Sequence, residues 1–275
     1  MQRETAVSRP AWASAIGGTG TNRKSPVEIF ATAASVFTRS TYAEISGLRT
    51  GKFGRWTDGV TAMREDCVAF AAYWRAQNDH VLHDLETDKD PGPLWVALGD
   101  STAQGLGAPD PRGGYVGQAL QQLRRRTGKH WRVLNLSVSG ALIRDVLSEQ
   151  IPRLPQQPDL VTCGVGANDI LYSAPGKLFG DLRAMLAAVP EQTVMLDLPL
   201  PTGYGWLVGR MSVPYITRIN RVIHEVAKDR GLPVAAVSAQ FTPPWTGKFS
   251  VDSFHPSQDG YRDWTRALLA TLPAA

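Results

Sequence analysis

The chain has 275 residues, of which 43% are hydrophobic and 20% are charged, and its formal net charge at pH 7 is +4. These values are ordinary for a soluble globular protein, and the length allows one large domain or one domain with an appendage. Two cysteines, Cys67 and Cys163, are too few for a disulfide framework, which excludes a disulfide-rich scaffold and fits a reducing cytosol.

The sequence offers no membrane-spanning or nucleic-acid-binding segment. The longest uncharged stretch near the start, Ile29 to Thr38, is far shorter than the ~20 apolar residues that a spanning helix needs. Glu28 precedes it and no clean small-residue cleavage site follows, so the layout is not that of a signal peptide. The tightest basic cluster, Arg124 to Arg132, falls where a helix is expected to end, and the helix dipole favours cations there. We therefore expect a cytoplasmic protein without a nucleic-acid partner. The sequence does not determine the oligomeric state.

The first 93 residues divide into two parts. Residues 1 to 26 are rich in Gly, Thr, Ser and Arg without an apolar period, and we expect them to be flexible. From Thr61 to about Leu85, apolar residues recur at helical spacing and predict a helix that packs on the rest of the protein. Met63 opens a stretch that contains this helix and everything after it, so residues 1 to 62 are interpreted as an accessory tail or an upstream extension of the reading frame. The expected divisions are an extension over 1–60, a helix and linker over 61–93, and the main domain over 94–275.

His80 and His83 lie three positions apart on this expected helix. Such a pair can contribute to a metal site, but the sequence positions no third ligand beside them. A partly exposed helix surface is the better interpretation, and we expect neither a metal nor a cofactor.

After residue 93, short apolar runs alternate with helical patterns. Strands are expected over 94–98, 133–136, 159–166, 193–198 and 233–237, and helices over 114–126, 141–154, 177–189, 213–230 and 256–272. The alternation predicts an α/β fold in which a parallel sheet of about five strands has helices on both faces, a three-layer α/β/α sandwich with an N-terminal helical extension.

The first candidate motif is Gly99-Asp100-Ser101, which follows the apolar run from Leu94 to Leu98. Ser101 therefore lies just beyond an expected strand, where α/β proteins place their ligand clefts. A serine hydroxyl is a poor nucleophile until a base removes its proton, so the motif has catalytic meaning only together with a histidine. Without one, Gly-Asp-Ser is an ordinary turn.

The candidate base lies near the other end of the chain, in the segment Asp252 to His255. Pro256 follows the histidine, and proline disfavours the helical conformation of the residue before it and suits the first turn of a helix. His255 is therefore expected in an extended loop before a helix, where Asp252 can hold one imidazole nitrogen while the other faces Ser101. The alternative is a helix-capping aspartate beside an incidental surface histidine.

Two further motifs are candidates for an oxyanion-binding site. Asn168, in the segment Gly166 to Asp169, follows the third expected strand, and its side-chain amide is a neutral donor that does not titrate. Gly140, which follows Ser139 after the second expected strand, would let a backbone N–H approach a substrate closely. Alone, each motif is better explained structurally, as a helix N-cap and a tight turn.

In this order, the motifs resemble those of the SGNH (GDSL-type) hydrolases, a family named for its Ser, Gly, Asn and His. The resemblance covers about residues 94 to 272. One departure is Thr102, which stands where the family name implies Leu, and this position bears on pocket shape rather than on chemistry. The resemblance implies a flavodoxin-like fold. It also implies these roles: Ser101 as nucleophile, His255 as base, Asp252 as the residue that orients the base, and an oxyanion hole made by the Ser101 and Gly140 amides with the Asn168 side chain.

The resemblance implies hydrolysis of a carboxylic ester through an acyl-enzyme, with a small-molecule ester or acyl compound as substrate. Acyl transfer to an alcohol or a sugar uses the same residues and stays open. A binding protein that keeps the fold without turnover is a third reading, but it has no physical need for an Asp-His pair. The segment Pro199 to Pro214 is interpreted either as a mobile loop that lines an acyl pocket or as an ordinary packed loop, and Trp245 and Phe249 are candidates for the other side of that pocket.

Overall fold

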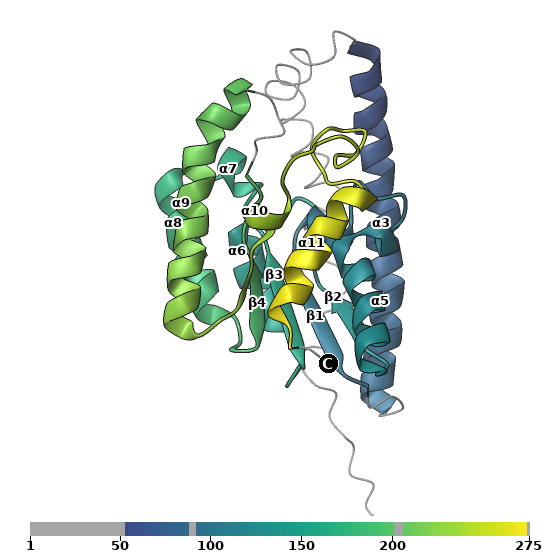
Figure 1. Ribbon diagram of the computed structural model, residues 1–275. Helices are drawn as coiled ribbons and strands as arrows, with labels where there is room; N and C mark the ends of the chain where they lie inside the picture. Colours follow the sequence, from purple (N-terminus) through teal and green to yellow (C-terminus); the bar gives the residue numbers. More distant parts are fainter. Residues whose placement is uncertain (1–52, 88–91, 201–205, 274–275) are drawn as a thin grey trace, which may run out of the picture.

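The computed structural model describes residues 53–87, 92–200 and 206–273, and within them the chain forms a five-stranded parallel sheet with helices on both faces (Figure 1). The strand order is β2-β1-β3-β4-β5, so the first strand in the chain lies inside the sheet and the second lies at its edge. This is the predicted α/β architecture. The strands are β1 (Leu94–Gly99), β2 (Arg132–Asn135), β3 (Leu160–Gly164), β4 (Thr193–Leu196) and β5 (Val234–Ala235).

Alternate side chains of the strands enter two separate hydrophobic clusters, one on each face of the sheet. In β1, Val96 and Leu98 belong to the first cluster, while Trp95 and Ala97 belong to the second. All six residues of β1 are buried, as expected of a parallel strand covered on both sides. The near-continuous apolar sequence of this strand therefore reflects burial on two faces rather than one.

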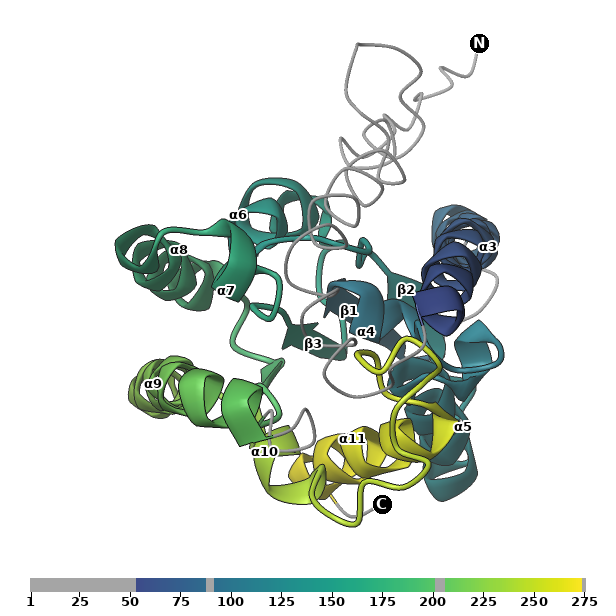
Figure 2. The ribbon, with the colours of Figure 1, turned by 90° about the horizontal axis from the view of Figure 1, so that it is seen from above.

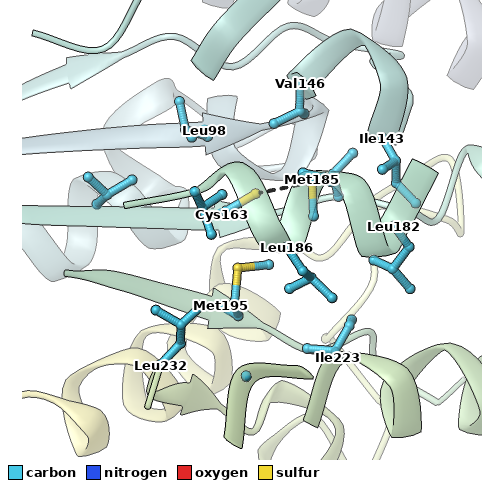
Figure 3. Packing of buried hydrophobic residues seen from close by; sticks show 14 of the residues in the cluster. Leu98, Ile143, Val146, Cys163, Leu182, Met185, Leu186, Met195, Ile223 and Leu232 are labelled. Carbon is cyan, nitrogen blue, oxygen red and sulfur yellow. Dashed lines mark hydrogen bonds between the residues drawn. The ribbon is translucent and has the colours of Figure 1, made fainter. Parts of the chain in front are cut away.

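Figure 2 shows which helices form the two outer layers. On one side lie α8 (Pro175–Ala188) and α9 (Trp206–Arg230), and on the other lie α5 (Tyr115–Thr127) and α11 (Gln258–Thr271). In the first layer, Met185 of α8 packs its sulfur 3.8 Å from the sulfur of Cys163 in β3 (Figure 3). Cys163 and Cys67 are both buried and neither forms a disulfide.

The helix α3 (Phe53–Thr87) runs beside the edge strand β2 and begins eight residues before the predicted start at Thr61. The side-chain amide of Asn78 donates to the carbonyl of Asn135 over 2.7 Å and accepts from the amide of Asn135 over 2.8 Å. It thereby satisfies backbone groups at the end of an edge strand, which otherwise lack a neighbour. The helix packs on the domain as predicted, whereas residues 1–52 of the expected extension lie outside the described part of the chain.

Two helical predictions differ from the structure. The expected single helix over 141–154 is three short pieces: α6 (Ile143–Asp145), a π-helical turn η2 (Val146–Gln150) and a 3₁₀ turn η3 (Ile151–Arg153). The buried side chain of Gln150 bonds both the N–H and the C=O of Gly99, each over 2.8 Å, and Pro152 cannot donate a backbone hydrogen bond. Pro152 therefore interrupts the regular backbone hydrogen bonding of a helix in this segment. The side chain of Gln150 anchors the end of β1.

The helix α9 begins at Trp206 rather than at the predicted residue 213, and Pro214 lies inside it. The helix continues past Pro214, although this proline cannot donate a backbone hydrogen bond. Of the described helices, none has both the length and the apolar character that crossing a membrane requires.

Candidate active site

Ser101 lies at the first position of the short helix α4 (Ser101–Gln104), immediately after β1. Asp100 caps this helix by accepting hydrogen bonds from the amide and the hydroxyl of Thr102, over 3.0 and 2.8 Å. The sharp turn needs glycine at position 99, because φ there is +143° and an added Cβ would lie 2.3 Å from the carbonyl oxygen of Gly164. The local sequence thus places the Ser101 hydroxyl at the carboxyl end of an interior strand.

The hydroxyl of Ser101 lies 2.9 Å from Nε2 of His255, and Nδ1 of the same ring lies 2.6 Å from Oδ2 of Asp252. All three side chains are buried. The structure therefore brings together the three residues that the sequence selected as nucleophile, base and orienting acid. In this arrangement the carboxylate accepts from Nδ1–H, which leaves Nε2 free to accept the serine proton.

A compact turn holds Asp252 beside His255. The second carboxylate oxygen, Oδ1, accepts hydrogen bonds from the hydroxyl of Ser250 and from the amides of Phe254 and His255, over 2.5, 2.8 and 3.0 Å. The turn requires Ser253 to adopt a left-handed conformation with φ of +56°, which few residues other than glycine tolerate cheaply. Burial opposes ionisation of Asp252, but the charge of His255 and these hydrogen bonds outweigh it and hold the pKa of the carboxyl below its usual value.

The two other candidate oxyanion donors, Gly140 and Asn168, lie close to each other. Gly140 has φ of +80°, a conformation that suits glycine, and it is buried. Within the described part of the chain, its amide donates to no backbone carbonyl, which is uncommon for a buried residue. The side-chain amide of Asn168 donates to the carbonyl of Ala141 over 3.1 Å, which places it beside this turn with a second N–H still to use.

The buried carboxylate of Asp169 bonds to residues that follow the Gly140 turn and Asn168 in the chain. Asp169 is fully buried, and its carboxylate accepts from the amide of Ile143 and the hydroxyl of Ser173, each over 2.9 Å. Burial is the largest influence on this group and raises the pKa of Asp169 to about 6. The carboxylate therefore links the start of α6 to the start of α7 (Asp169–Tyr172). Its negative charge at neutral pH is disfavoured by burial.

Sequence reasoning missed two buried glutamines near Ser101. Gln104 at the end of α4 and Gln150 in η2 are both buried, and the side-chain amide of each donates one hydrogen bond and accepts another. Neither residue belongs to a motif, and a buried glutamine leaves no periodic signal in the sequence. Only the three-dimensional structure shows their partners.

Among the described residues, no three His, Cys, Asp or Glu side chains come together in an arrangement that could hold a metal ion. His80 and His83 both lie on the exposed side of α3.

A cavity of about 560 Å³ lies beside the turn that carries Asp252. Its walls include Phe249, the loop over residues 106–109, and Met63 and Asp66 of α3. Of the two predicted pocket aromatics, Phe249 therefore lines a cavity. Trp245 packs against it with ring centroids 5.8 Å apart. The other predicted wall, Pro199 to Pro214, lies partly outside the described residues, and from Trp206 onward it is helix rather than loop.

A family model for the GDSL-like lipase/acylhydrolase family matches residues 97–262, the segment that begins within β1 and ends within α11. The chain belongs to this family. Membership makes it an enzyme of the esterase and lipase type, with the SGNH fold that the strand order and the helical layers display. The match excludes α3, which lies before residue 97.

Solved structures with the same fold include several enzymes of the SGNH type. The structure of TesA shares 26% sequence identity and a TM-score of 0.53, covering 65% of this chain and 97% of that chain. A lipase from a goat rumen metagenome, Lip_vut3, shares 20% identity and a TM-score of 0.56 over 65% of this chain and 97% of that one. A variant of Axe2, an acetyl xylan esterase from Geobacillus stearothermophilus, shares 20% identity and a TM-score of 0.55 over 66% of this chain and 95% of that one. A search of curated proteins found no match.

Proposed function

We propose that this GDSL-like enzyme hydrolyses a carboxylic ester through an acyl-enzyme on Ser101. The observation that carries the proposal is the continuous hydrogen-bonded series from the Ser101 hydroxyl to His255 and on to Asp252, with distances of 2.9 and 2.6 Å. A buried serine is reactive only beside a base, and the base is effective only in the tautomer that a carboxylate selects. The two contacts of His255 correspond to these two requirements.

In the first half of the reaction, Nε2 of His255 removes the proton of Ser101 as the serine oxygen attacks the acyl carbonyl carbon. The carbonyl π bond breaks to give an oxyanion, and when it re-forms, the bond to the alcohol oxygen breaks. The imidazolium gives its proton to the departing alcohol. Asp252 stays ionised throughout and stabilises the imidazolium, in keeping with its lowered pKa.

In the second half, a water molecule replaces the alcohol. His255 takes a proton from the water as the water oxygen attacks the acyl carbonyl carbon. When the second tetrahedral intermediate collapses, the bond to Oγ of Ser101 breaks, the carboxylic acid leaves, and the imidazolium returns its proton to the serine oxygen. The amides of Ser101 and Gly140 and the side chain of Asn168 bind the oxyanion in both halves. The placement of Asn168 beside the Gly140 turn supports this assignment.

The test is hydrolysis of p-nitrophenyl esters from acetate to palmitate by the wild type and by Ser101→Ala. Ser101→Ala is expected to lose activity while keeping its fold. The matched control is Ser148→Ala, which removes the hydroxyl of an exposed serine in η2. Wild-type activity in Ser101→Ala would refute the proposal. The panel also reports which acyl length the enzyme accepts.

Acyl transfer is distinguished by adding an alcohol acceptor such as glycerol. If a serine-directed fluorophosphonate labels Ser101 but no ester in the panel is hydrolysed, and ester exchange with glycerol occurs, the enzyme is a transferase. The residues and the acyl-enzyme are the same in both cases, and only the acceptor differs.

A further inference from the structure

Gln104 joins the nucleophile helix α4 to the loop that carries Gly140. Its side-chain Nε2 donates to the carbonyl of Ser137 over 2.9 Å, and its Oε1 accepts from the hydroxyl of Ser139 over 2.6 Å. All three residues are at most 5% exposed, so these bonds are shielded from water. Gln104 lies three positions after Ser101, at the other end of a single helical turn.

The loop needs such a constraint. Gly140 adopts a left-handed conformation, and glycine is the residue with the greatest backbone freedom. Its amide nitrogen belongs to the peptide unit that follows Ser139. The two hydrogen bonds of Gln104 hold the loop at Ser139 and, two residues earlier, at Ser137. They therefore restrain the backbone that leads into the peptide unit between Ser139 and Gly140.

A second set of bonds ties the same two segments together from the side of α3. The indole Nε1 of Trp74 donates to the backbone carbonyl of Gln104 over 2.9 Å. The side chain of Asn135 donates to the carbonyl of Ala103 over 2.8 Å. The side chain of Asn78 in turn bonds both the backbone N–H and the backbone carbonyl of Asn135. The helix α3 therefore anchors both the nucleophile turn and the start of the oxyanion loop.

We propose that Gln104 is a positioning residue that sets the Gly140 amide relative to Ser101, with α3 as its external anchor. The inference rests on the proposed roles of Ser101 and Gly140 as the nucleophile and an oxyanion donor. Donors in such a site must be held to within about 0.5 Å of the productive geometry. Loss of the Gln104 bridge releases the Gly140 turn, so the oxyanion is stabilised less while substrate binding is unchanged.

A glutamine that only satisfies buried polar groups would affect stability and leave catalysis intact. The two roles are separated by Gln104→Met, which keeps the length of the side chain and removes both hydrogen bonds. Its matched control is Gln118→Met in α5. The side chain of Gln118 likewise makes two hydrogen bonds, donating to the backbone carbonyls of Gly113 and Gln258 over 2.6 and 2.9 Å, and neither carbonyl belongs to the oxyanion loop.

We expect Gln104→Met to lower kcat by about 10- to 100-fold with KM within about twofold of the wild type. A trifluoromethyl ketone whose acyl group matches the best ester forms a tetrahedral oxyanion adduct with Ser101. Its inhibition constant is expected to rise by the same factor as kcat/KM falls, because both report oxyanion binding. Gln118→Met is expected to change neither quantity.

Ser139→Ala is the second variant, since it deletes one hydroxyl and breaks only one half of the bridge. It is expected to show the same pattern to a smaller degree, and to add little to Gln104→Met because the two residues act as a unit. The proposal is overturned if a folded Gln104→Met, or Ser139→Ala should the former not fold, retains the kcat and ketone affinity of Gln118→Met. Failure of the proposed function is a separate outcome, seen as full activity in Ser101→Ala.

Discussion

Nε2 of His255 lies 2.9 Å from Oγ of Ser101, although 154 positions separate the two residues in the sequence. The contact depends on how α11 is placed relative to β1, because Ser101 follows β1 and His255 stands in the loop that precedes α11. The helix α11 packs against α5, which follows the nucleophile loop, through a cluster that includes Tyr115 and Trp264, with ring centroids 5.7 Å apart. Packing of the layer on this face therefore fixes the distance between nucleophile and base.

The first prediction concerns the three residues that act in series. His255→Ala is expected to reduce kcat nearly as much as Ser101→Ala, since the serine then has no base. Adding Asp252→Ala to His255→Ala is expected to cost little more, because members of a triad lose their effects together rather than additively. Steady-state kinetics on the best p-nitrophenyl ester compare the wild type with Ser101→Ala, His255→Ala, Asp252→Ala and the double variant. Losses that multiply in the double variant would show that Asp252 acts independently of His255.

The second prediction concerns Asn168. Asn168→Ala is expected to lower kcat by roughly 10²–10³-fold with little change in KM, because the amide binds charge that develops only in the transition state. The bond from Asn168 to the carbonyl of Ala141 is also lost, so thermal unfolding is recorded in parallel. A rise in KM at unchanged kcat would assign Asn168 to ground-state binding instead.

The third prediction concerns the turn before the nucleophile. Gly99→Ala is expected to destabilise the protein by about 3 kcal/mol or more, since its Cβ would meet the carbonyl oxygen of Gly164 at 2.3 Å. Gly128→Ala is the control, because φ there is also positive, at +65°, but no atom lies within 4 Å of the added Cβ. It is expected to cost about 1 kcal/mol. Urea unfolding measures both, and equal losses would contradict the close approach of β1 and β3 at Gly99.

The fourth prediction uses the raised pKa of Asp169. The folded protein holds this proton with a pKa of about 6, above the ordinary 3.8, so the associated stability is complete below the lower value and disappears as the pH rises through the higher one. Asp169→Asn carries no such proton. The free energy of unfolding of the wild type is therefore expected to fall relative to that of Asp169→Asn, by up to about 3 kcal/mol from about pH 4 to about pH 7.

Urea unfolding of both proteins across this range is the measurement. A constant difference between them reflects the altered hydrogen bonds to Ile143 and Ser173, which do not titrate. Two parallel curves would therefore show that Asp169 is not protonated in the folded protein near pH 5.

Much of the fold followed from local signals. The strand before Ser101 was predictable because a run buried on both faces is almost wholly apolar, and Pro256 marked the start of the last helix within two residues. The break of the predicted helix over 141–154 was not predictable. It depends on Gln150 bonding the backbone of Gly99, a residue 51 positions earlier in the chain, and no local pattern reports such a partner.

The same division holds for the candidate site. Spacing and order select Ser101, Asp252 and His255 as candidates, since the Asp-His turn is local and Ser101 follows a strand end, and the structure brings these three residues together. Gln104 was missed because its partners, the carbonyl of Ser137 and the hydroxyl of Ser139, lie in the loop that follows β2. Trp74 lies in the helix that the sequence predicts, but helical spacing does not report that its indole N–H donates to the backbone carbonyl of Gln104.

The central claim is that an acyl group is transiently bonded to Ser101, and trapping that intermediate tests it most directly. The protein is mixed with the best p-nitrophenyl ester, quenched in acid during the first turnovers, digested and analysed by mass spectrometry. We expect one acyl adduct, on the peptide that contains Ser101, formed with a burst of p-nitrophenol and absent from Ser101→Ala. An adduct on another residue, or a burst that persists in Ser101→Ala, would contradict the account.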